Sequence, residues 1–228
     1  MDRAEQVLQY MLRPSIDDCL DLWFGKSAQT DREIASRFGA DVALASRGHF
    51  DHWALDAGCP RRLVALVVLL DQFPRNIYRG SARMFAGDAS CRDLVKHAWR
   101  AGVGERLQPI ERVLLCLALT HSEALEDQQL CMAEWQRIGI RLAADAPLNA
   151  FDEIFRRHLA VIRRFGRFAH RNAVLQRPST AAEVAFLQDG AFRFDLPMVR
   201  QPDGAIAFAG ACGYGYGSLP AASAAAAA

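Results

Sequence analysis

Leu63-Val64-Ala65-Leu66-Val67-Val68-Leu69-Leu70 is the longest purely apolar run of the sequence, and it leads directly into Asp71-Gln72-Phe73-Pro74-Arg75-Asn76. The apolar run is hydrophobic on every side of a helix, which is typical of a segment surrounded by protein. Pro74 lacks an amide proton and disfavours helical dihedral angles at Phe73, so we expect the helix to kink or end there. Polar side chains beside such a break form a candidate site, although Asp71 and Arg75, four residues apart, can also simply pair with each other.

Helical signals recur on both sides of this run, whereas sustained strand-like alternation and hairpin turns between β-branched runs are nearly absent. Ser15 precedes an apolar stripe that ends at Gly25, which indicates a helix over 15–24. Thr30 with Glu33, and Thr180 with Glu183, have the spacing of capping boxes. Further helices are predicted at about 60–73, 88–101, 109–138 (whole or broken) and 148–166. Short connections favour antiparallel neighbours, and the predicted fold class is all-α.

The character of the chain changes near residue 190. Charges become sparse from Ala191 onward, and a Gly/Tyr run at 210–217 leads into an alanine-rich end. Such a segment lacks the periodic apolar face that would dock it. We therefore expect a single helical domain over residues 1–190 and a flexible C-terminal extension over residues 191–228.

Composition excludes several classes of protein. Hydrophobic residues make up 51% of the 228 residues, which excludes extensive disorder, and no apolar run approaches the roughly 18 residues of a membrane span. No secretory signal is visible at the start, so a cytoplasmic protein is expected. The six cysteines form no short Cys/His cluster, and we predict reduced thiols with no metal and no cofactor. The 27 basic residues, of which 25 are Arg, balance 26 acidic ones, and this near-neutral total makes nucleic-acid binding an unlikely function.

Three polar residues turn toward apolar helix faces. His158 falls inside the apolar arc of residues 155–168, and His121 and Gln128 share the inner face of residues 113–135. A buried histidine that is hydrogen-bonded to a neighbour is the simplest interpretation for each one. Two histidines on different helices also favour a shared polar pocket.

Seven arginines lie between Arg156 and Arg177, and no acidic residue occurs between Arg156 and Glu183. Three interpretations are open: a solvated helix face paired with acids elsewhere, a pocket for a carboxylate or phosphate, or a nucleic-acid surface. The planar guanidinium fork suits the second because it binds oxyanions through two hydrogen bonds.

These segments together resemble a known family. Leu69–Gly80, then His121-Ser122-Glu123 with Asp127-Gln128, then His158 with Arg164–Asn172 and Ser179-Thr180 are similar, in the same order, to the uncharacterised bacterial family catalogued as domain of unknown function 924. The resemblance spans roughly residues 20–190. It implies an all-helical fold similar to tetratricopeptide repeats, and it implies no activity or cofactor.

The chain departs from the family pattern at two informative positions. Ala169 stands where the family has Pro, and Gln176 stands where it has Gly. Glycine permits positive φ and glutamine resists it, so the second change puts in doubt a close backbone approach to a ligand there.

The first functional hypothesis is a pocket for a small anionic molecule or a peptide terminus. In it, Arg75, Arg167 and Arg171 would hold the anionic group, and histidines with Asp71 would orient the remainder. The full predicted set comprises Asp71, Gln72, Arg75, Asn76, His121, Gln128, His158, Arg167, His170 and Arg171.

Two alternatives come from other classes of protein. A hydrolase or transferase would use His121 or His170 as general base with Glu123 or Asp71 as its partner, although no nucleophile elbow, P-loop, Rossmann fingerprint or H-E-x-x-H is present. A scaffold would bind a partner helix or peptide in a groove, but no repeat of about 34 residues is visible. Whether the protein is an enzyme, and its oligomeric state, are left open by the sequence.

Overall fold

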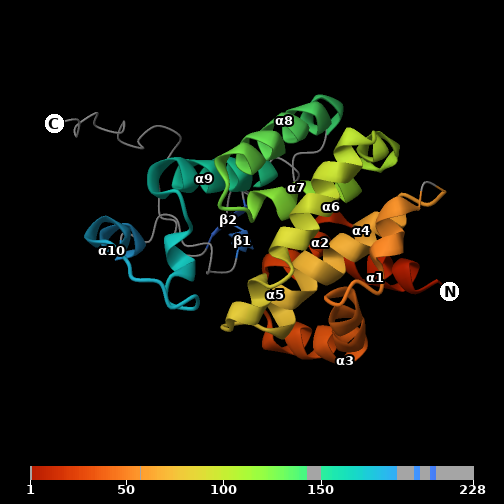
Figure 1. The fold of residues 1–228 in the computed structure, drawn as a ribbon, viewed down its shortest axis with the longest axis horizontal. Helices are drawn as coiled ribbons and strands as arrows, with labels where there is room; N and C mark the ends of the chain where they lie inside the picture. Colours follow the sequence, from red (N-terminus) through yellow and green to blue (C-terminus); the bar gives the residue numbers. More distant parts are fainter. Residues whose placement is uncertain (1, 57, 143–149, 189–197, 201–205, 209–228) are drawn as a thin grey trace.

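The centre of the fold is the segment that is apolar on every side. In the computed structural model, which describes residues 2–56, 58–142, 150–188, 198–200 and 206–208, no side chain from Leu63 to Leu69 is more than 1% exposed. Helices α1 (Arg3–Met11), α6 (Asp88–Arg100) and α7 (Pro109–Thr120) pack against this segment, and α3 (Ala28–Ala45), along the bottom of the view in Figure 1, packs against its second part. The five described cysteines are free thiols, and four of them are buried, as expected for small apolar residues.

Ten α-helices form the described part of the chain together with short 3₁₀- and π-helical segments: α1 Arg3–Met11, α2 Ile16–Phe24, α3 Ala28–Ala45, η1 Asp51–Leu55, α4 Arg61–Val67, η2 Val68–Gln72, α5 Phe73–Ile77, η3 Ala82–Phe85, α6 Asp88–Arg100, η4 Val103–Arg106, α7 Pro109–Thr120, α8 Leu125–Leu142, α9 Ala150–Phe165, η6 Ala169–Arg171 and α10 Ala181–Gln188. Helix α7 packs against α8, α4 and α6, and α8 also packs against α9. The predicted all-α class is confirmed. None of these described helices combines the length and the apolar character that a membrane span requires.

The helix does not end at Pro74, so this part of the expectation is wrong. The helix passes from α4 through the π-helical turn η2 directly into α5, and Phe73 keeps helical dihedral angles of −63° and −36°. In the π-turn the Phe73 amide donates to the Val68 carbonyl, five residues earlier rather than four. This shift in the hydrogen-bond pattern accommodates Pro74. Pro74 has no amide proton to donate, and in a regular α-helix its ring would clash with the carbonyl group four residues earlier.

The predicted helix over 109–138 is broken into α7 and α8. His121 is the C-cap residue of α7, and α8 begins at Leu125. The side chain of Gln128 donates to the carbonyl oxygens of Thr120 and Ser122 at 2.7 and 2.6 Å, and these bonds fix the turn between the two helices.

Of the three helix N-termini predicted from capping residues, two are confirmed and one is wrong. Ser15 caps α2, and Thr180 and Glu183 cap α10 through reciprocal bonds to each other's amides. The capping box at Thr30 does not form, because Ser27 accepts from the Thr30 amide and starts α3 three residues earlier.

A short hairpin follows the helices. Strands β1 (Met198–Arg200) and β2 (Ile206–Phe208) pair antiparallel, with Met198 opposite Phe208. The sequence predicts almost no strands, and it does not predict this pair, because strands of three residues offer too few positions for an alternating pattern. The turn signal Asp203-Gly204 does lie between the two strands in the sequence. Apart from these two strands, residues 191–228, for which flexibility is expected, lie outside the described residues. The domain boundary at residue 190 stays a prediction.

Candidate functional site

A cavity of about 310 Å³ lies between α2, η2, α5, α7, α9 and η6, and we call it the central cavity. Ten of its twenty described lining residues are apolar or aromatic and nine are polar or charged, so the cavity offers both the apolar surface and the polar groups that small-molecule sites combine. It is lined by Met11, Leu22, Trp23, Phe24, Lys26, Ile34, Gln72, Phe73, Arg75, Asn76, Arg79, Gly80, Met84, Leu117, His121, Ile154, His158, His170, Arg171 and Val174.

Behind the wall, a carboxylate from the buried helix meets a histidine from the end of α7. Nδ1 of His121 lies 2.9 and 3.0 Å from the two carboxylate oxygens of Asp71, whose side chain is 1% exposed. The amide of Gln72 and the guanidinium of Arg75 also contact this carboxylate, Arg75 at 3.0 Å. An Nδ1–H that donates to Asp71 leaves the lone pair on Nε2, and His121 is one of the residues that line the cavity.

Charges around this pair set its protonation. Burial opposes ionisation of Asp71, but the cation of Arg75 and the hydrogen bond from His121 outweigh it and lower the pKa of Asp71 to about 2. Burial and Arg75 lower the pKa of His121 below its ordinary value of 6.5, and Asp71 only partly counteracts them. At neutral pH the pair is therefore a carboxylate and a neutral imidazole.

Two arginines meet at a second carboxylate beside His121. Asp88, at the start of α6, lies 3.0 Å from Arg75 and 3.3 Å from Arg171, and Arg171 also donates to the His121 carbonyl at 2.9 Å. The Arg171 guanidinium lies 4.5 Å from the ring centres of Phe85 and Phe168. Burial and the Arg75 cation lower the pKa of Arg171 to about 10, so it stays charged at neutral pH.

The remaining histidines extend the polar end of the cavity. Nδ1 of His158 lies 2.7 Å from the Ile154 carbonyl oxygen, which can only accept, so Nδ1 carries the proton of this hydrogen bond. The ring centre of His158 is 6.2 Å from that of His121. Burial and the neighbouring His121 lower the pKa of His158 well below its ordinary value. His170 lines the same cavity from η6. Within the described residues no three His, Cys, Asp or Glu side chains lie close enough together to hold a metal ion.

Seven of the predicted site residues line this one cavity: Gln72, Arg75, Asn76, His121, His158, His170 and Arg171. Asp71 lies directly behind His121. The other three lie elsewhere, since Arg167 is paired with Glu183 at 2.6 Å, Gln128 fixes the α7–α8 turn and Glu123 binds Arg177.

Glu123 and Arg177 hold the loop that carries His170 and Arg171. Glu123 accepts from the Phe168 amide at 2.8 Å and from two nitrogens of Arg177 at 2.7 and 2.9 Å, and Arg177 donates to the Phe168 carbonyl. Gln176, just before Arg177, adopts φ of 53°. The left-handed conformation for which the family uses glycine is therefore kept, in spite of the glutamine.

The arginine-rich stretch is mostly a paired surface. Salt bridges tie Arg156, Arg157, Arg167, Arg171 and Arg177 to carboxylates, and only Arg171 among them lines the cavity. Arg164 instead lies over the ring of Phe165.

Several lining residues were not predicted. Trp23 and Phe24 are the last two residues of α2, Lys26 lies two residues after this helix, and Arg79 lies two residues after α5. Lys26 has φ of 52°, one of two positive values among the described non-glycine residues, and Arg79 is paired with Asp31 at 2.7 Å. In the sequence, Trp23 and Phe24 belong to the apolar stripe of a helix, and no local pattern marks Lys26 as a site residue.

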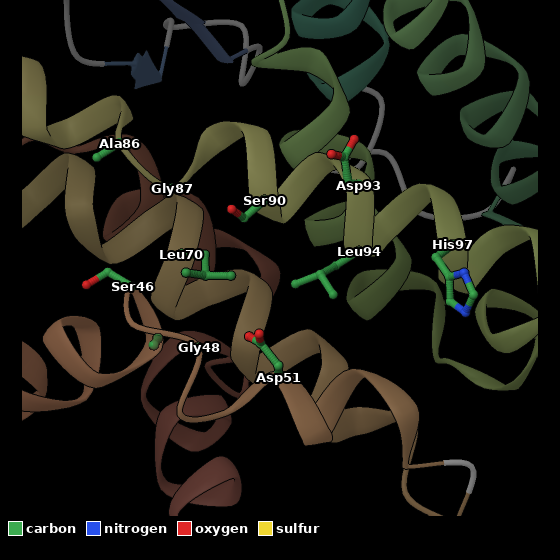
Figure 2. A pocket seen from close by; sticks show the side chains of 11 residues that line it. Ser46, Gly48, Asp51, Leu70, Ala86, Gly87, Ser90, Asp93, Leu94 and His97 are labelled. Carbon is green, nitrogen blue, oxygen red and sulfur yellow. The ribbon is translucent and has the colours of Figure 1, made fainter.

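A second pocket of about 360 Å³ lies between the end of α3, η1 and α6 (Figure 2). Figure 2 shows Ser90, Asp93, Leu94 and His97 along α6, with Ser46 and Asp51 below them in the view and the Asp93 carboxylate pointing away from both. Asp51, Asp93 and His97 are exposed, and no buried ionisable pair backs this pocket in the described structure. The central cavity is therefore the stronger candidate.

Comparisons with known proteins show the family of the chain. The chain is similar to a protein of unknown function from Agrobacterium tumefaciens whose structure is solved: the identity is 32%, the TM-score is 0.69, and the match covers 82% of this chain and 97% of that chain. No curated protein matches the chain. The sequence pattern of a bacterial protein family of unknown function, DUF924, matches residues 7–191. The chain therefore belongs to the DUF924 family.

Proposed function

We propose that this protein binds a small organic anion in the central cavity. The observation that carries this proposal is the sign of the charges on the cavity wall. Its four charged lining residues, Lys26, Arg75, Arg79 and Arg171, are all cations, and no Asp or Glu is among the described residues that line it. The acids that balance them lie behind the wall, as Asp71 and Asp88 do.

The apolar part of the wall supports an organic ligand rather than a bare inorganic ion. Met11, Leu22, Trp23 and Phe24 line the cavity together with Met84. A ligand with an aromatic or aliphatic body would bury apolar area against these side chains while its anionic group reaches the arginines. Arg171 keeps one buried nitrogen, Nε, that has no hydrogen-bond partner among the described residues.

Binding is tested with a fixed panel of anions: phenylpyruvate, phenylacetate, phenyl phosphate and N-acetylphenylalanine, the last as a mimic of a peptide terminus. Trp23 lines the cavity, so tryptophan fluorescence and the melting temperature both report occupancy. We expect at least one anion to bind and to raise the melting temperature, whereas phenylacetamide, its neutral counterpart, does not.

Two arginine variants locate the site. Arg171→Met removes a cation from the wall, and Arg167→Met removes one that is paired with Glu183 outside it. We expect the first to weaken binding at least tenfold and the second to leave it unchanged. Failure of every anion to bind, or equal binding of phenylacetamide, would contradict the proposal.

The other hypotheses stand differently. The Asp71–His121 pair favours a catalytic role, which is developed below. The tetratricopeptide-like arrangement, a peptide groove and a cytoplasmic location stay predictions from the sequence, and a positive result with N-acetylphenylalanine alone would favour peptide binding.

A further inference from the structure

We propose that His121 is the general base of an enzyme that moves a proton on a 2-oxo carboxylate, taking it from the carbon next to the ketone. The proposal rests on the proposed function, because it assigns chemistry to the anion held in the central cavity. Asp71 is the positioning residue for His121, and Arg75 and Arg171 hold the oxygens of the substrate.

The position of His121 is that of a base held ready. Its Nδ1 is bound to a buried carboxylate at 2.9 Å, which fixes the ring orientation and leaves Nε2 as the basic nitrogen, and the residue lines the central cavity. An imidazolium formed by proton transfer would be stabilised by Asp71 at once. The charged and titratable groups around the ring come from five elements: Asp71 of η2, Arg75 of α5, Asp88 of α6, His158 of α9, and Arg171 of η6.

The cavity wall lacks hydroxyl, thiol and carboxylate nucleophiles. None of the described residues that line it is Ser, Thr, Cys, Tyr, Asp or Glu. A hydrolase or transferase with a hydroxyl, thiol or carboxylate nucleophile is therefore not built into this site. Proton transfer by histidine requires no such group.

The two arginines match the charge that would develop. Arg75 and Arg171 share Asp88 at 3.0 and 3.3 Å, so their guanidinium groups lie together beside His121. A 2-oxo carboxylate carries one negative group, and removal of its neighbouring proton places a second negative charge on the ketone oxygen. Two adjacent guanidinium groups can bind the carboxylate and stabilise this second charge.

The step balances without any other reactant. The C–H bond next to the ketone breaks, and its proton goes to Nε2 of His121. Its electron pair forms the carbon–carbon double bond of the enolate, and the carbonyl electrons move to the oxygen. Return of the proton from Nε2 to the same carbon restores the substrate. In D₂O the returned proton is a deuteron, so exchange reports the step even when nothing else follows.

The experiment measures deuterium exchange into the methylene group of phenylpyruvate by proton NMR at pH 7.5. We expect the full-length protein to accelerate exchange above the buffer rate. His121→Asn retains an amide that can donate to Asp71 but removes the base, and we expect at least a 100-fold loss of the catalysed rate with binding changed less than threefold. His97→Asn, in the second pocket, should exchange like the wild type.

The outcomes separate the two proposals. If phenylpyruvate binds to the wild-type protein in the fluorescence assay but its exchange is no faster than with His121→Asn, the catalytic inference is overturned and the anion-binding proposal stands. Absence of binding by every anion would overturn both. Phenylacetate, which lacks the ketone, should bind without fast exchange.

The positioning role of Asp71 is tested by the pH dependence of the catalysed exchange rate. If Asp71 had a purely structural role, its replacement would not shift the midpoint of this pH dependence. The catalysed rate should rise with pH as His121 loses its proton and then level off. Asp71→Asn removes the carboxylate that favours the protonated ring, so the midpoint of the profile should shift to lower pH and the plateau should fall. A lower plateau with an unshifted midpoint would contradict the positioning role.

Discussion

Replacing Asp71 by Asn tests how much the buried ion pair contributes to folding. The side chain is 1% exposed, contacts Arg75 at 3.0 Å and His121 at 2.9 Å, and has a pKa of about 2 instead of the ordinary 3.8. At about 1.4 kcal/mol for each pKa unit, this difference corresponds to about 2 kcal/mol of stability at neutral pH. Asn keeps the shape and removes the charge, so the variant should unfold with a free energy lower by about that amount.

The sign of the pH dependence follows from the lowered pKa. A carboxylate with a depressed folded pKa stabilises the fold above its unfolded pKa, and this contribution is lost as pH falls through the folded pKa. The difference between wild type and Asp71→Asn should therefore be full at pH 7, about half as large at pH 3, and small at pH 2.

Urea unfolding followed by tryptophan fluorescence at these pH values measures the difference. Asp93→Asn is the matched control, because this aspartate is 69% exposed on α6 and its loss should change stability little. A difference of the same size at pH 3 and pH 7 would refute the reasoning, since it would show that packing, and not ionisation, is responsible.

Three further substitutions test the local structure. Gln176→Gly should raise the melting temperature, with a gain in stability of about 1 kcal/mol, because glycine adopts φ of 53° without strain; a lower melting temperature would count against this account. Gly87→Ala should destabilise by about 2–3 kcal/mol in urea unfolding, since a Cβ there would lie 2.3 Å from the Leu70 carbonyl oxygen. Gly39→Ala, a helical site with open space, should instead stabilise, and similar effects at both glycines would contradict the packing argument. Glu123→Gln should speed hydrogen exchange of the amides over 166–177, and unchanged protection would show that the loop does not depend on this carboxylate.

Local patterns predicted most of the helices, but they could not rank competing signals. The capping boxes at Thr30 and Thr180 read alike, yet Ser27 starts its helix earlier and only the second box forms. Pro74 predicts a break by its own chemistry, whereas the buried helix continues because a π-turn shifts the hydrogen-bond ladder.

The candidate site shows the same division. Helical periodicity correctly turned His158 inward, because the face of a residue depends on its near neighbours. The same kind of signal also selected Gln128, which meets two carbonyls of a turn instead of the cavity. Periodicity indicates which side chains face inward, but it does not indicate what they meet there.

By itself, the sequence determined the helical class and the buried segment over 63–70, because both depend on residues within a turn or two of each other. Only the tertiary structure decided which charges face the cavity. The pairs that settle this join residues far apart in the chain, such as Asp71 with His121, Arg171 with Asp88 and Arg177 with Glu123, at separations of 50, 83 and 54 residues. A chain that is neutral overall thus folds around a cavity with a cationic wall, because its acids lie behind that wall.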